Sequence, residues 1–178
     1  SFRPWNETVN LIEDYNTRLM LGLTGRLWDF SCVDDHYLEK ARLEGKELVI
    51  GDQRFGAVIL PPLTTIRRAS LRKLAEFWRA GGKVLAVRLL PASSPEAGGD
   101  DPEIISGVEA LFGKDAARTP LEFATSGNAA GGRAVFVQAD LGVLFDELEA
   151  VLPKDVRVTE GPKEGLVVQH RRRPGCDI

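Results

Sequence analysis

Two cysteines and two histidines are the residues of this 178-residue sequence that could supply a nucleophile and its base. A thiol becomes a working nucleophile when a nearby imidazole accepts its proton, which makes Cys32, Cys176, His36 and His170 the candidates. Cys32 lies in an apolar run, where a buried free thiol is the usual outcome. Neither histidine has an evident thiol partner, and the cysteine spacing fits neither a disulfide framework nor a metal site. These residue types therefore predict no catalytic residue and no metal ligand.

Two adjacent carboxylates, Asp34 and Asp35, could act in acid–base chemistry or as metal ligands. Side chains of neighbouring residues diverge, so a shared proton is not implied, and an aspartate before a short helix commonly caps that helix. We therefore interpret this pair as a helix cap. The glycine pairs at 98–99 and 131–132 lack the spacing of dinucleotide-binding or phosphate-binding loops, and no cofactor is predicted.

A basic segment near the end of the chain supplies the only candidate site residues. We predict that His170, Arg171 and Arg172 contact an anion or a neighbouring domain, because arginine donates paired hydrogen bonds to carboxylates. The alternative interpretation is a solvated basic edge that discourages pairing with other strands.

The elements that must position these residues are organised around residues 47–91, which predict one βαβ unit. The strand at 57–60 is apolar on both faces, as a strand covered by helices requires, and Pro61 and Pro62 end it. Ser70 is the expected cap of the helix that follows. That helix has an apolar stripe and ends at two glycines, before a second strand at 83–87.

The flanking sequence predicts further helices and strands around this unit. Helical patterns are expected at residues 6–23, 36–43, 102–112 and 140–152, with caps at Asn6, at Asp34 or Asp35, and at Asp140. Strands are expected at 27–33, 47–50, 54–60, 133–138, 156–158 and 166–170, with a hairpin turn at 51–53. Residues 92–101 are expected to form an exposed loop, and residues 114–132 to be the least structured part of the chain. The fold class is α/β: three layers, doubly wound, with a mainly parallel sheet and helices on both faces.

Composition limits the classes of function. With 43% hydrophobic and 28% charged residues, the chain reads as one globular domain over residues 1–178. A formal net charge of −3 argues against a nucleic-acid partner, and no apolar stretch is long enough to cross a bilayer. The sequence opens without a methionine and stops as a new strand begins, so we expect a segment of a longer protein.

Four stretches in order carry a family resemblance: Trp-Asp-Phe-Ser-Cys-Val-Asp-Asp at 28–35, residues 51–63 with their Leu-Pro-Pro-Leu, Gly-Gly-Lys-Val at 81–84, and residues 170–178. Together they resemble the domain that follows the catalytic barrel in large multidomain bacterial glycoside hydrolases of the α-L-rhamnosidase type. The resemblance covers roughly residues 10–178. It implies a flavodoxin-like fold of the class I glutamine amidotransferase kind, and partners in the same protein: the catalytic barrel and a sugar-binding β-sandwich. It also implies an export compartment, periplasmic or extracellular, and a possible homo-oligomer.

The resemblance transfers no catalytic residue to this chain. Active amidotransferases place a cysteine at the turn directly after the strand equivalent to residues 83–87, whereas this sequence continues with Arg88, Leu89, Leu90 and Pro91. We therefore expect a non-catalytic accessory domain with structural, interdomain or oligomerisation roles. One alternative is a small-molecule or sugar-binding module that uses the loops at 61–65 and 88–94, at the carboxyl ends of the strands. A less favoured alternative is an amidotransferase-type cysteine hydrolase.

Overall fold

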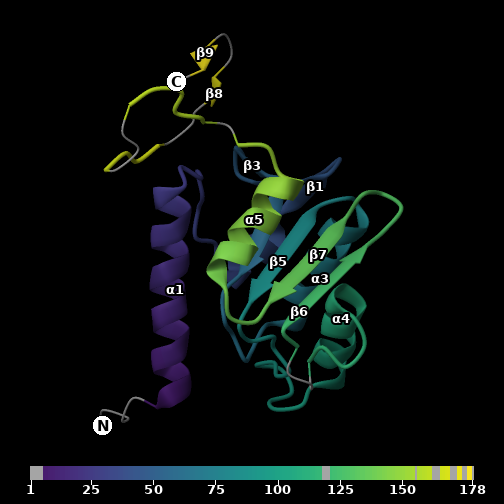
Figure 1. Cartoon of the computed structure of the whole chain (residues 1–178). Coiled ribbons are helices and arrows are strands. Elements are labelled where there is room, and N and C mark those ends of the chain that lie inside the picture. Colours follow the sequence, from purple (N-terminus) through teal and green to yellow (C-terminus); the bar gives the residue numbers. More distant parts are fainter. Residues whose placement is uncertain are drawn as a thin grey trace.

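Five helices and nine strands follow one another in the computed structural model, which describes residues 6–117, 121–154, 156–161, 165–168, 172–173 and 176–177 (Figure 1). In chain order they are α1 (Glu7–Gly25), α2 (Asp35–Lys40), β1 (Arg42–Glu44), β2 (Glu47–Ile50), β3 (Gln53–Phe55), β4 (Ala57–Leu60), α3 (Arg68–Arg79), β5 (Lys83–Val87), α4 (Pro102–Phe112), β6 (Phe123–Gly127), β7 (Arg133–Val137), α5 (Leu141–Val151), β8 (Arg172–Arg173) and β9 (Cys176–Asp177).

The main sheet is mixed, with strand order β4-β5-β7-β6. Strands β4, β5 and β7 are parallel, and β6 adds an antiparallel strand to β7. The predicted βαβ unit is confirmed as β4-α3-β5, with Ala57 in register with Lys83. The predicted α/β class is therefore correct, and the strand at the β6 edge was not expected.

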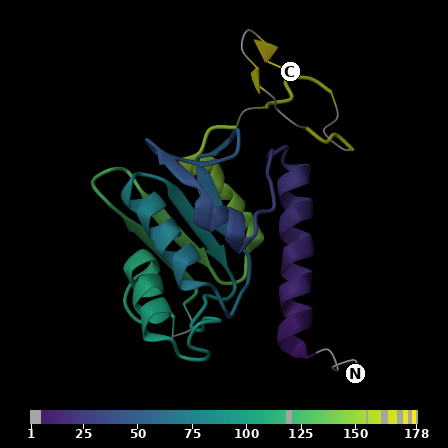
Figure 2. The ribbon, with the colours of Figure 1, turned by 180° about the vertical axis from the view of Figure 1, so that it is seen from behind.

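Helices lie on both faces of this sheet. Val84 and Ala86 of β5 belong to a core that includes residues of α3 and α4, whereas Leu85 and Val87 belong to a core that includes residues of α1 and α5. Figure 1 shows α5 in front of the sheet, and Figure 2, turned by 180°, shows α2 and α3 in front of it. The two-sided apolar pattern of β5 follows from this double cover.

A second sheet, β1-β2-β3, lies beside the start of β4. The predicted hairpin at residues 51–53 is confirmed, because β2 and β3 pair antiparallel on either side of Gly51, whose φ is +59°. The predicted single strand at 54–60 is divided at Gly56, and β3 and β4 belong to different sheets. The short helix ends at Lys40 rather than at residue 43, since Arg42–Glu44 pairs with β2 as β1.

Side-chain caps begin three of the helices as the sequence predicts. Asn6 accepts the backbone N–H of Val9, Asp34 accepts that of Tyr37, and Asp140 accepts that of Gly142.

The predicted cap at Ser70 is wrong. α3 begins at Arg68, three residues before the predicted start at Leu71; the side chain of Arg67 does not cap it, and Glu96 accepts the backbone N–H of Arg68. Ser70 is instead buried within the first turn, and its hydroxyl donates to Asp35 of α2.

Several predictions for the irregular parts of the chain are wrong. The sequence predicts a strand at residues 27–33, but residues 28–34 pair with no strand among the described residues; Leu27, with φ +60°, turns the chain at the end of α1. Residues 114–132 contain β6. Residues 156–158 and 166–168 are not strands, while residues 169–170 lie outside the described part. The final pairing is instead the short β8–β9 ladder.

Candidate functional site

The chain leaves the central strand β5 through a strained residue. Arg88 follows Val87 directly and has φ +70°, a left-handed conformation that is unfavourable for a side chain with a Cβ. Its backbone N–H donates to the carbonyl of Val137, and the N–H of Leu89 donates to the carbonyl of Val87, which makes the turn tight. The resemblance described above implies a nucleophile at this turn in an active enzyme, and a guanidinium cannot fill that role.

The side chain of Arg88 lies beside Tyr15 of α1. It forms no ion pair with a carboxylate in the described part of the chain. Its guanidinium carbon lies 5.9 Å from the ring centre of Tyr15, and the hydroxyl of Tyr15 donates to the carbonyl of Ala139 at 3.1 Å. Within the described residues, the buried Nε of Arg88 has no hydrogen-bond partner. Arg88 and Tyr15 therefore connect α1 to the carboxyl ends of β5 and β7 through packing.

Replacing Arg88 by glycine should raise the free energy of unfolding by about 1 kcal/mol. Glycine adopts a left-handed backbone without the penalty of about 1–2 kcal/mol that other residues carry, and the change removes a buried polar atom without a partner. Urea denaturation followed by circular dichroism measures the effect. The R88K variant, which keeps the backbone penalty, is the control and should show no gain.

The prediction that Cys32 is buried is wrong. Cys32 is exposed, like the other residues of 29–34, which form no strand in the described part of the chain. His36 lies on α2, with its Nε2 2.9 Å from the Nζ of Lys40, and Tyr37 packs edge-on against its ring. The thiol and the imidazole thus have separate surroundings. The two neighbouring carboxylates are structural, as expected: Asp34 caps α2 and Asp35 accepts the hydroxyl of Ser70.

Cys32 should react as an ordinary surface thiol. We expect iodoacetamide to alkylate it at pH 7 at nearly the same rate in the folded chain as in urea, because no base is placed beside it among the described residues. The measurement is the mass-spectrometric rate of alkylation at Cys32. A folded-state rate many times the unfolded one would contradict the assignment and favour a cysteine hydrolase.

No group of three or more histidine, cysteine or carboxylate side chains that could hold a metal ion exists in the described part of the chain. No helix among the described residues is long and apolar enough to cross a membrane. The basic segment cannot be placed: His170 and Arg171 lie outside the described residues, and Arg172 is described only as backbone in β8, in register with Asp177. Its role as an anion or interdomain contact stays a prediction.

A buried ion pair that the sequence pattern did not indicate anchors the loop before α4. The carboxylate of Asp101, fully buried, accepts two hydrogen bonds from Arg68, at 2.8 and 3.0 Å. It also accepts the Ser94 hydroxyl and the backbone N–H of Glu103, so it caps α4. The Arg68 guanidinium, together with these donors, holds the pKa of Asp101 well below its usual range.

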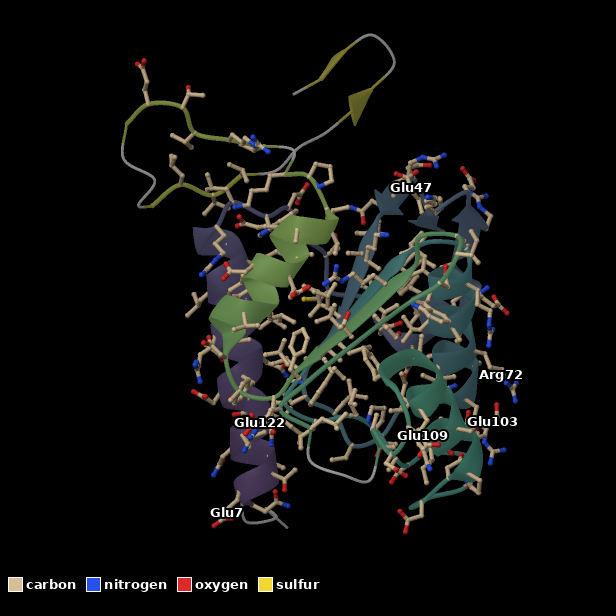
Figure 3. The ribbon with its side chains drawn as sticks, turned by 45° about the vertical axis from the view of Figure 1, so that its right-hand side comes forward. Glu7, Glu47, Arg72, Glu103, Glu109 and Glu122 are labelled. Atoms are coloured by element: carbon tan, nitrogen blue, oxygen red, sulfur yellow. The ribbon has the colours of Figure 1, made fainter. Side chains whose placement is uncertain are left out.

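The loop at residues 92–101 is exposed only at its tip, residues 95–100, because Ser94 and Asp101 hold its ends. On the outer side of the same helix pair, Arg72 and Glu103 form a surface ion pair at 2.6 Å, and Figure 3 shows the two side chains facing each other from α3 and α4. These ion pairs and hydrogen bonds join α3 to α4, and we assign the cluster a structural role.

A cavity of about 600 Å³, which we call the β4 slot, is lined by the strand β4. Its lining includes all four residues of β4 and all of residues 28–35. The slot is closed on one face by Leu19, Met20 and Leu23 of α1 with Leu148 and Leu152, and on the other by Leu38, Leu48, Ile50, Phe55 and Ile66. Pro61, Leu63 and Thr65, from one of the two loops expected to form a ligand crevice, lie at its end, whereas residues 88–94 do not line it.

Comparison with known proteins adds no relative to this geometry: no protein-family model, no curated protein and no solved structure matches the chain.

Proposed function

We propose that this chain is a non-catalytic accessory domain of a larger carbohydrate-active enzyme, a glycoside hydrolase of the α-L-rhamnosidase type. In this proposal it packs against the other domains of that enzyme, a catalytic barrel and a sugar-binding β-sandwich, or forms a homo-oligomer contact. The support from sequence is the resemblance carried by residues 28–35, 51–63 and 81–84. The support from structure is a mixed α/β sheet with three parallel strands and helices on both faces, which suits a flavodoxin-like arrangement.

The observation that carries the proposal is Arg88. An amidotransferase-like domain concentrates its chemistry at the turn after the central strand, and here that turn holds an arginine packed on Tyr15. Cys32 lies on another segment, and the described histidine, His36, is engaged with Lys40. The turn after β5 can contact a neighbouring domain, but its side chains supply neither a nucleophile nor a base.

The surface that we propose to face a neighbouring domain lies on the α1 side of the molecule. Met20 and Leu21 of α1 are 42% and 67% exposed, and Phe30 and Val33 in the next segment are 37% and 41% exposed. Apolar groups gathered in this way are characteristic of protein contact surfaces. The sugar-binding alternative is less well supported, because the slot lining is mostly apolar and a sugar requires several hydrogen-bond partners.

The experiment compares the isolated chain with the full-length polypeptide that carries it. We expect the full-length protein to hydrolyse an aryl α-L-rhamnoside, and the isolated chain neither to hydrolyse it nor to release ammonia from glutamine. Deleting residues 6–161 from the full-length protein should lower its Tm or change its oligomeric state, measured by calorimetry and light scattering. Turnover by the isolated chain, or a full-length protein without glycosidase activity, would refute the proposal.

A further inference from the structure

Strand β4 has an open edge. In the described part of the chain it hydrogen-bonds to β5 alone, so the backbone groups on its other side face the β4 slot. Exposed edge strands are normally protected by charged residues, by proline or by a covering element, because an open row of N–H and C=O groups pairs readily with another strand. All four residues of β4 (Ala57, Val58, Ile59 and Leu60) are uncharged and apolar, so neither a charge nor a proline within the strand prevents pairing.

The helices extend beyond the edge of the sheet. Leu19 and Leu23 of α1 lie over one face of the slot and Leu38 of α2 lies under the other, so both outer layers cover a position where the middle layer has no strand. The four residues of β4 span about 13 Å at about 3.3 Å per residue. The slot therefore has the cover, the apolar lining and the backbone edge that a further strand of similar length needs.

The segment on the far side of the slot supports the same conclusion. Residues 28–33 have the composition of a strand, yet they pair with no strand. A disagreement of this kind between local sequence and structure is expected when the neighbouring strand of a sheet is absent. A strand inserted beside β4 would present its other edge to residues 28–33.

From these observations we infer that the β4 slot is an acceptor for one β-strand: an extended, apolar segment of a neighbouring polypeptide inserts parallel to β4, between β4 and residues 28–33. The inference rests on the proposed role in interdomain packing and names the form of the contact. Parallel pairing fits because both faces of the slot are covered by apolar side chains. A polypeptide fits better than a lipid or a sugar, because only another backbone pairs with the row of donors and acceptors along β4.

A peptide that copies residues 82–88 tests the inference, because it contains β5, which is already a parallel partner of β4. The capped, fluorescent peptide is titrated into the whole chain and binding is followed by anisotropy. The matched control peptide carries Leu85→Pro, since proline removes a backbone donor and does not fit a central strand. We expect saturable binding of the first peptide, binding at least about tenfold weaker for the second, and slower hydrogen exchange at Ala57–Leu60 and residues 28–33.

Two neighbouring residues of α1 provide matched variants of the chain itself. Met20 lines the slot and Leu21 does not, although both are exposed, so neither change should prevent folding. M20E should weaken peptide binding by about tenfold or more, because the inserted strand would bury the new charge. L21E should leave binding unchanged.

Three results would overturn the inference: no saturable binding of the copied peptide, equal binding of the proline peptide, or equal loss in M20E and L21E. Equal binding of the proline peptide would show that the slot recognises apolar side chains and not a strand. Each of these results leaves the glycosidase assay of the full-length protein untouched, so failure here is distinguishable from failure of the proposed function.

Discussion

Replacing Phe77 by alanine should lower the free energy of unfolding by about 3–5 kcal/mol, the usual cost of removing a buried aromatic ring. Phe77 is fully buried on α3, and its ring fills the space beside Gly82, where an added Cβ would lie 2.2 Å from the ring. Removing the ring leaves this space at the start of β5 without its occupant, and we expect the cavity to remain open. Urea denaturation followed by far-ultraviolet circular dichroism gives the measurement.

The control for this prediction is Phe123, a phenylalanine of β6 that is 45% exposed. F123A should cost much less than F77A, since little apolar surface is removed from the interior. Similar losses in the two variants would show that the α3 side of the sheet does not hold the main core.

Asp101→Asn should make the chain less stable at neutral pH and less sensitive to acid. The pKa of Asp101 is lowered in the folded chain, chiefly by the hydrogen bonds from Arg68, so its ionised form stabilises the fold. That stabilisation is fully present above the pKa of an unfolded aspartate, about 4, and is lost as pH falls toward the lower folded value. The difference in Tm between the wild type and D101N should therefore be constant from pH 7 to about pH 5 and shrink below about pH 4.

Asp140→Asn is the matched control for Asp101→Asn. Asp140 also caps a helix, α5, but its side chain is exposed. Among the described residues, no other side chain donates a hydrogen bond to it. Asparagine is an equally good cap, so D140N should change little at any pH. If D101N and D140N gave the same pH profile, the buried pair with Arg68 would not be the cause of the acid sensitivity.

Local chemistry made the centre of the fold predictable. The strand at 57–60 is closed by two prolines, the helix after it ends at Gly81 with φ +107°, and β5 is apolar on both faces. Each of these features is fixed by neighbouring residues or by burial on both sides, and each was found where the sequence placed it. The caps at Asn6, Asp34 and Asp140 were predictable for the same reason.

The features that depend on distant partners were not predictable. Strand β6 exists because its residues pair with β7, although its own sequence, Phe-Ala-Thr-Ser-Gly, resembles a loop. Asp101 and Arg68 are 33 residues apart, and no periodicity connects them. Cys32 was expected inside a strand, but residues 28–34 form no strand in the part of the chain that the structure describes, and Cys32 is exposed.

The features of the candidate site also differ in whether neighbouring residues or distant ones determine them. The absence of a nucleophile after β5 could be read from Arg88 and its neighbours, but the left-handed backbone at that residue could not. The β4 slot could not be predicted from the sequence, because it is lined by segments that meet only in the folded chain, among them α1, residues 28–35 and β4.

The unequal margins of the main sheet have a consequence for self-association. At the β6 margin, alternate residues are exposed, and the strand carries a serine, a threonine and a terminal glycine; the Ser126 hydroxyl is committed to the carbonyl of Leu111 in α4. At the β4 margin the strand is wholly aliphatic. Fibre growth by sheet extension requires two adhesive margins on every molecule, so that each added copy offers a new one. With only the β4 margin wholly aliphatic, we expect copies of this chain that join through their sheets to stop at a closed, finite assembly.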